Sequence, residues 1–106
     1  MDTSVIDTAE KQAALCRVLG SARRLIILWL ISQGELSVNE IAERVGSSVQ
    51  NISQHLSLLK RWGFVNARRD GQTIYYQLAD AEYLKQCPAL QHAPEALNES
   101  ITTHQK

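Results

Sequence analysis

The side chains best suited to recognition chemistry in this sequence are carboxamides in a short stretch near its middle. Gln50, Asn51, Gln54 and Arg61 recur at spacings that place them on one side of a helix. A carboxamide can pair bidentately with adenine in the major groove of DNA. The pattern therefore predicts a helix that reads duplex DNA.

The helix that carries these side chains also has an apolar side. Val49, Ile52, Leu56 and Leu59 fall at spacings of three and four residues and predict one buried stripe. A serine at position 47 or 48 is suited to begin the helix, because its hydroxyl can accept a hydrogen bond from a free backbone amide. Burial of the stripe would leave the amide-rich side facing outward.

A β-hairpin is predicted directly after this helix. Its strands span 65–69 and 73–78, and Asp70-Gly71 between them favours a type I′ turn. Arg68 and Arg69 lie beside that turn, where they would meet phosphates or the minor groove. A polar helix followed by a basic hairpin is the order of a winged helix-turn-helix.

Two helices are expected near the start of the chain. Asp7 and Glu10 have the spacing of a capping box, which would open a helix over 7–19. Ser21 is expected to cap a second helix. Its run 25–31 is apolar nearly all round, so this helix belongs in the centre of the core.

The other helices flank the DNA-reading segment. Ser37-Val-Asn-Glu40 predicts a second capping box, which opens a helix that ends at Gly46. Asp80 is expected to cap a last full helix over 81–87, which Pro88 ends or kinks, and one more turn is expected from position 94. The expected order is therefore α-α-α-α-β-β-α, mainly α with a small antiparallel β-hairpin.

Length and composition restrict the class of protein. The 106 residues predict a single domain, 1–106, with its DNA-reading unit at about 37–78. The net charge is zero, but positions 44–72 hold five basic residues and one acidic residue, which indicates a local basic patch. The sequence has no apolar run of membrane length and no secretory signal, and its two cysteines make no disulfide framework, so a cytoplasmic protein is expected. No catalytic motif is found, which argues against an enzyme.

With these elements placed, the chain resembles the ArsR/SmtB family of bacterial repressors over about residues 9–87. The resemblance implies a homodimer built on the first and last helices, at about 7–19 and 80–97. It also implies binding to an imperfect palindrome of double-stranded DNA in the protein's own promoter, and release when an inducer binds. The residues that carry it are Ala22-Arg-Arg-Leu-Ile-Ile-Leu28, Glu35-Leu-Ser-Val-Asn-Glu-Ile41, Ser53-Gln-His-Leu-Ser-Leu-Leu59, Gly63-Phe-Val65 and Asp70-Gly-Gln-Thr-Ile-Tyr-Tyr-Gln-Leu78.

The resemblance also places recognition positions on the reading helix. Gln50 and Gln54 are predicted to contact base edges, whereas Ser48, Ser53 and His55 are predicted to contact phosphate or to orient their neighbours. A structural hydrogen bond is an equal alternative for His55. The complete predicted DNA-binding set is Ser48, Gln50, Asn51, Ser53, Gln54, His55, Arg61, Arg68, Arg69 and Gln72.

The resemblance implies an inducer, and in this family the inducer can be a metal ion bound at one of two sites. We therefore compare the residues of this chain with the ligands expected at each site. Where the family's thiolate site has cysteines, this chain has Ser37 and Asn39, whose oxygens cannot replace sulfur for soft metal ions. The family's second site would fall on the C-terminal segment. There the first expected histidine is replaced by a glutamate, which disfavours zinc or nickel. The candidate ligands at that site are Asp80, Glu82, His92 and Glu95.

The leading inducer hypothesis rests on the two cysteines. Cys16 and Cys87 fall on the first and last helices, which the implied dimer brings together, so oxidation, persulfidation or arsenite could bridge them. Two buried, inert thiols are the plain alternative. A regulator without any small-molecule switch and a winged-helix protein-interaction module also stay open. No cofactor is required by any of these hypotheses.

Overall fold

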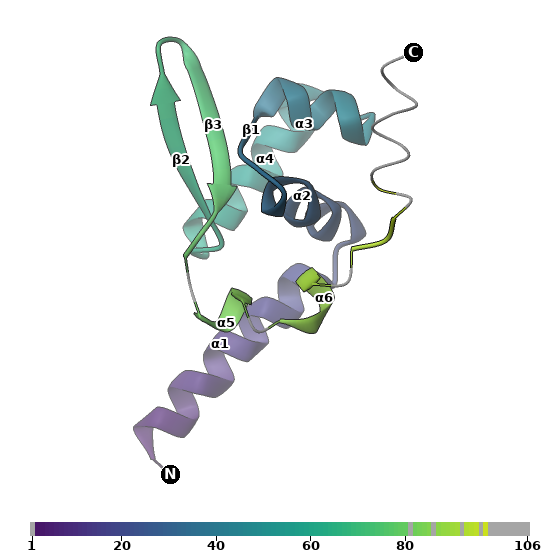
Figure 1. Ribbon diagram of the computed structural model, residues 1–106. Helices are drawn as coiled ribbons and strands as arrows, with labels where there is room; N and C mark the ends of the chain where they lie inside the picture. Colours follow the sequence, from purple (N-terminus) through teal and green to yellow (C-terminus); the bar gives the residue numbers. More distant parts are fainter. Residues whose placement is uncertain (1, 81, 86, 92, 96, 98–106) are drawn as a thin grey trace.

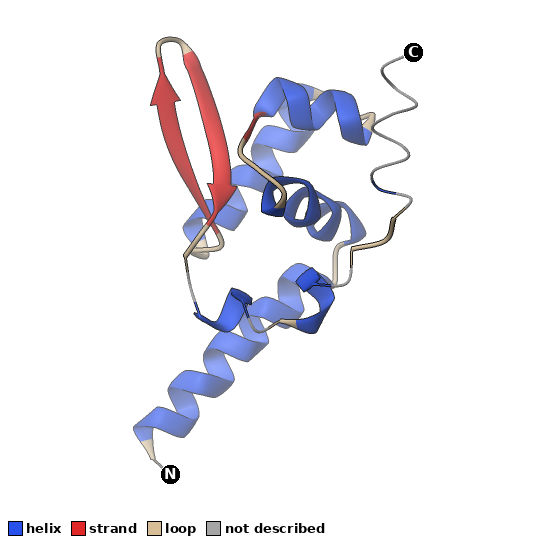
Figure 2. Ribbon diagram, in the orientation of Figure 1, coloured by secondary structure: helices blue, strands red, loops and turns tan. Residues whose placement is uncertain are grey.

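The computed structural model describes residues 2–80, 82–85, 87–91, 93–95 and 97 (Figure 1). Within them the fold is mainly helical with a small antiparallel sheet, as predicted (Figure 2). The sheet has the strand order β1-β3-β2, and its two-residue β1 had no signal in the sequence. The elements are α1 (Thr3–Leu19), α2 (Ala22–Ser32), β1 (Leu36–Ser37), α3 (Val38–Val45), α4 (Val49–Arg61), β2 (Val65–Asp70), β3 (Thr73–Leu78), α5 (Glu82–Lys85) and α6 (Pro88–Gln91).

The core forms where α2 meets α3, α4 and the base of the hairpin. The apolar run of α2 supplies four buried side chains, which confirms its central place. From α4, Ile52, Leu56 and Leu59 are fully buried, and Phe64 is fully buried in the same core. Val49 was expected in the same stripe, but 44% of its surface is exposed. It is the first residue of α4, and the packed part of the helix begins one turn later.

Serine caps define the starts of α2, α3 and α4, as the sequence predicted. Ser21 accepts a hydrogen bond from the backbone amide of Arg24. Ser37 and Glu40 form the complete capping box, with distances of 3.2 and 2.9 Å. Ser48 accepts from the amide of Asn51 at 3.0 Å and so fixes the start of α4.

The start of α1 differs from the prediction. The helix begins at Thr3 instead of at position 7, so Asp7 and Glu10 do not form a capping box. Asp2 caps it instead, because its carboxylate accepts from the amide of Ser4 at 3.2 Å. Asp7 lies within the helix, where it pairs with Lys11 at 3.3 Å. The N-terminal half of α1 extends away from the helical body (Figure 1).

The hairpin projects from the opposite end of the molecule, as Figure 1 shows. Asp70 pairs with Thr73, so the two-residue loop is Gly71-Gln72 instead of Asp70-Gly71. A type I′ turn needs positive φ at both loop residues, whereas here Gly71 has φ +65° and Gln72 does not have positive φ. The predicted type I′ turn is therefore wrong; a glycine at the first loop position is typical of type II′.

The expected helix over 81–87 is also shorter than predicted. The structure has α5 at Glu82–Lys85 and a second short helix, α6, which Pro88 opens. Proline is well suited to the first helical position because its missing N–H would have no partner there. The indole N–H of Trp29 donates to the carbonyl of Ala89 at 2.8 Å and ties α6 to α2. The turn expected from Pro94 is present as a hydrogen bond from Leu97 N to its carbonyl, at 3.1 Å.

No helix in the described part of the chain is long and apolar enough to cross a membrane.

Candidate nucleic-acid interface

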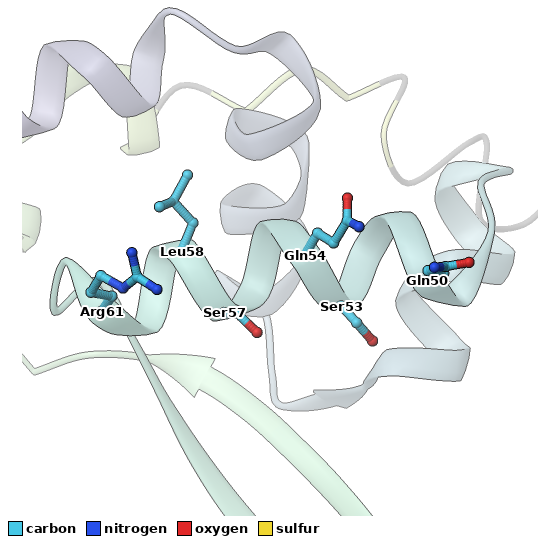
Figure 3. A pocket seen from close by; sticks show the side chains of 6 residues that line it. All are labelled: Gln50, Ser53, Gln54, Ser57, Leu58 and Arg61. Carbon is cyan, nitrogen blue, oxygen red and sulfur yellow. The ribbon is translucent and has the colours of Figure 1, made fainter.

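The outward side of α4 forms an open hollow (Figure 3). Gln50 lies near the start of the helix and Arg61 at its end, with Gln54 between them, and all three are exposed. Buried Ile52 and Leu56 hold the opposite side of the helix in the core. The surface thus presents two amides and one guanidinium to a partner in solution. The residues that line the hollow are Gln50, Ser53, Gln54, Ser57, Leu58 and Arg61.

The hairpin of β2 and β3 is called the wing below. The edge of α4 that faces the wing brings two more predicted DNA-binding residues together. Ser53 of α4 and Gln72 of the hairpin loop line one groove, along with Asn39 at the start of α3 and Tyr76 of β3. α4 and the hairpin therefore form one continuous surface. This juxtaposition is the one that a winged helix-turn-helix uses on DNA.

Asn51 lies on the other edge of α4, toward α2, and is half-buried. Its side-chain oxygen accepts hydrogen bonds from Arg23 Nη1 at 3.0 Å and from the Ser47 hydroxyl at 3.1 Å. Arg23 Nη1 also donates to the Ser47 oxygen at 3.0 Å. Sequence reasoning did not select Arg23 or Ser47 for this site. Arg23 is 28 residues from Asn51, so no local spacing reveals the contact.

His55 lies on the same edge as Asn51 and is half-buried. Burial lowers the pKa of His55 below its ordinary value, and the positive charges of Arg24 and Arg23 lower it further. Both effects favour the neutral imidazole. Next along this edge, the guanidinium groups of Arg24 and Arg17 lie 5.3 and 5.7 Å from the ring centre of Trp62. Stacking on the indole is a favourable position for both cations.

The two wing arginines have different surroundings. Arg68 pairs with Glu35 through Nε at 3.2 Å and Nη2 at 2.5 Å, and it lies over the ring of Tyr75. The hydrogen bond to Arg68 lowers the pKa of Glu35, and the same bond raises the pKa of Arg68. The pair fastens β2 to the loop before β1. Arg69 and Gln72 are exposed near the tip of the hairpin.

The predicted sensor residues are only partly described. Cys16 on α1 is exposed and Cys87 before α6 is buried, and both are free thiols. Asp80 pairs with Lys85 at 2.5 Å, which lowers the pKa of Asp80. His92 lies outside the described residues, and so does the side chain of Glu82. In the part of the chain that the structure covers, no group of three or more His, Cys, Asp or Glu side chains could hold a metal ion.

Comparison with known proteins identifies the family. The family model described as bacterial regulatory protein, arsR family, matches residues 21–67, which include α2, α3 and α4. The transcriptional activator HlyU of Vibrio cholerae is 40% identical over 72 residues, which are 68% of this chain and 67% of HlyU. The chain belongs to the ArsR family. Its members are winged helix-turn-helix transcriptional regulators that bind DNA, and they are not enzymes.

Two further relatives extend the comparison. The transcriptional regulator KmtR of Mycobacterium tuberculosis is 44% identical over 70 residues, which are 66% of this ArsR-family chain but only 53% of KmtR. The chain thus spans about half the length of that relative. The homodimeric winged helix-turn-helix domain Mb0332 of Mycobacterium bovis has a TM-score of 0.70 and 30% identity, covering 99% of this chain and 90% of that one. The fold of the residues that the structure describes is therefore that of a winged helix-turn-helix domain.

Proposed function

We propose that this protein is a homodimeric, sequence-specific repressor that binds an imperfect palindrome with α4 in the major groove. The observation that carries the proposal is the exposed face of α4, where the side chains of Gln50 and Gln54 are open to solvent on the side opposite the buried apolar residues. A helix of 13 residues is about 20 Å long, enough to lie across the groove. Amides on this face can read adenine, and Arg61 can bind guanine or phosphate.

An unpaired apolar surface on α1 supports the dimer. Val5 and Ile6 are 51% and 45% exposed, on the half of α1 that extends beyond the body of the protein (Figure 1). A hydrophobic surface of this kind is stabilised when a second copy covers it. The similar Mycobacterium bovis domain is described as homodimeric. In a twofold dimer, two copies of α4 would meet half-sites about one helical turn apart.

Titration of the protein against duplexes from the upstream region of its own gene tests the proposal. The expected result is saturable binding to one duplex, with an affinity that falls steeply as salt rises because phosphate contacts release counterions. The matched control is Gln54→Ala, which should lose the cognate duplex but keep weak binding to random DNA. Absence of specific binding, or binding that salt does not affect, would favour the protein-interaction module instead.

The direction of regulation needs its own experiment. The names of similar proteins include both an activator, HlyU, and biofilm growth-associated repressors. We propose repression because a dimer on its own promoter would obstruct polymerase. Transcription from that promoter in vitro should fall when the protein is added. A rise would show an activator and leave the DNA-binding part of the proposal intact.

We propose that the inducer acts on the thiols of Cys16 and Cys87. Because Cys16 is exposed, a peroxide can reach it directly, whereas buried Cys87 would react only after a local opening. Formation of a disulfide removes two electrons and two protons from the thiols, and the peroxide accepts them and becomes water. One similar structure, with a TM-score of 0.67, is of reduced HlyU.

The inducer proposal is tested by DNA titration of the reduced protein before and after mild treatment with peroxide, persulfide or arsenite. Binding should collapse on treatment of the wild type and persist in Cys16→Ser and in Cys87→Ser. Collapse in both variants would show that another group reacts. If treatment never changes DNA binding, the proposal of a thiol switch is refuted and the proposal of a DNA-binding repressor is unaffected. A zinc or nickel titration of Glu95→Gln against wild type would then test the metal alternative.

A further inference from the structure

The side-chain oxygen of Asn51 is used twice inside the protein. It accepts from Arg23 Nη1 at 3.0 Å and from Ser47 Oγ at 3.1 Å. A guanidinium can only donate, so the oxygen of the amide, and not its NH₂ group, must face Arg23. An amide oxygen has two lone pairs, and these two contacts take both. The amide of Asn51 therefore has a fixed orientation and keeps donors only for outside partners.

This orientation changes what Asn51 can recognise. Bidentate pairing with adenine requires one amide to accept from N6 and donate to N7 at the same time. With its oxygen occupied, Asn51 can donate its N–H groups to guanine O6 and N7, or to thymine O4. On adenine it can donate only to N7, and the N6 amino group beside N7 finds no acceptor on Asn51, so the bidentate adenine pair is lost. Asn51 lies in the first turn of α4, and the N-terminal residues of a recognition helix are those that contact base edges.

We propose that Arg23 is a positioning residue for DNA reading, which holds Asn51 as a donor-only group that selects guanine or thymine over adenine. The inference rests on the proposed function and assigns the specificity of one position within it. Arg23 comes from α2 and is exposed, and the two side chains to which it donates hydrogen bonds, Ser47 and Asn51, are both neutral. Gln50 and Gln54 are exposed on a different side of α4, so their preference for adenine is not restricted in this way.

The experiment is selection of binding sites from a library of randomised DNA duplexes. It is performed in parallel with wild type, Arg23→Ala, Asn51→Ala, the double variant and Arg23→Lys. Lys60→Ala is the matched control, because it removes a positive charge from α4 at a position remote from Asn51 in the helix. Thermal unfolding of each variant shows whether it is folded.

Four results are expected. The wild-type motif should have one position that prefers guanine or thymine over adenine by about tenfold, and Asn51→Ala should make that position degenerate. Arg23→Ala frees the amide to rotate, so the same position should accept adenine while the rest of the motif is unchanged. The double variant should behave as Asn51→Ala alone, because Arg23 acts through Asn51. Arg23→Lys, which can still donate to the amide oxygen, should restore the wild-type preference.

Other results would overturn the inference. If Arg23→Ala keeps the wild-type motif and weakens every duplex equally, as expected for Lys60→Ala, then Arg23 contacts phosphate on its own account. An adenine preference that Asn51→Ala removes from the wild-type motif would show that the amide oxygen is available to DNA. If the wild type selects no motif, the proposed function itself fails, and this inference fails with it. If Arg23→Ala unfolds, it is replaced by Arg23→Met, which keeps the apolar stem but has no donor, and this variant should accept adenine at the same position.

Discussion

The two edges of α4 use arginine in opposite ways. On the α2 edge, Arg23 binds a hydroxyl and an amide, which are neutral. On the wing edge, Arg68 forms a two-bond pair with the carboxylate of Glu35. A neutral acceptor fixes the orientation of a guanidinium and leaves its charge uncompensated, whereas a carboxylate fixes the orientation and cancels the charge. The first arrangement can attract DNA phosphates, and the second mainly holds two parts of the protein together.

This comparison changes the meaning of the basic hairpin. Arg68 and Arg69 are neighbours in the sequence, and both were predicted to contact DNA. On alternate faces of β2, only Arg68 can reach the loop before β1, where Glu35 lies. We therefore expect Arg69 to carry the phosphate contact of the wing, and Arg68 to set the angle of the hairpin relative to α4.

The largest expected effect concerns the surface between the two edges. Gln54→Ala should cost about 1–3 kcal/mol on the cognate duplex and leave binding to random duplexes nearly unchanged, because a bidentate base contact is lost. Competition titrations with both kinds of duplex measure the two losses. Ser57→Ala on the same face is the control, since Ser57 is not among the predicted DNA contacts. Equal losses on both duplexes would refute base reading by Gln54.

The next effect separates the two wing arginines. Arg69→Ala should weaken binding to every duplex and reduce the slope of affinity against salt by about one unit, as expected for one lost phosphate contact. Arg68→Ala should reduce the slope by less, because Glu35 already compensates the charge of Arg68. The measurement is a salt titration of both variants on one duplex. Equal slopes would contradict the contrast between the two residues.

Much of this surface could be predicted from local sequence. The serine caps of α2, α3 and α4 and the apolar positions of α2 follow rules of spacing and local hydrogen bonding, and all of them were found. The boundaries that failed are those with competing signals of similar strength. Asp7 has the spacing of a cap, but Asp2 does the capping one turn earlier. Pro88 can end one helix or open the next, and here it opens α6.

The tertiary contacts of the site could not be predicted in this way. Arg23 and Asn51 are 28 residues apart, and Glu35 and Arg68 are 33 apart. No spacing rule joins residues at such distances, because the contact depends on how α2 and the hairpin pack on α4. Side-chain types alone therefore identified the amides and arginines of the surface. Only the folded structure shows which of these amides and arginines form hydrogen bonds or ion pairs with other side chains of the protein.

A smaller effect tests the wing edge with pH. Pairing with Arg68 lowers the pKa of Glu35 below its ordinary value of 4.5, so the contribution of the pair to stability is complete above about pH 4.5. That contribution is lost as the pH falls through the lowered pKa and the carboxylate takes up a proton. Amide hydrogen exchange in β2 and β3 should therefore accelerate relative to α4 in that range. Glu35→Gln should show the faster exchange at neutral pH already, and if it does not, the pair does not hold the hairpin.

The smallest effect tests the α2 edge, and it should appear at a higher pH than the effect at the wing. Burial lowers the pKa of His55 below 6.5, with further contributions from Arg24 and Arg23, so the unfolded chain binds a proton more readily than the folded one. As the pH falls below about 6.5, the free energy of unfolding should decrease, and above that value this contribution should be constant. Urea unfolding of wild type and His55→Gln from pH 5 to 8 measures the difference, because the variant lacks only this titrating group. If the two curves stay parallel, folding does not lower the pKa of His55; if wild type loses stability relative to the variant toward acid pH, acid weakens the α2 edge before it weakens the wing.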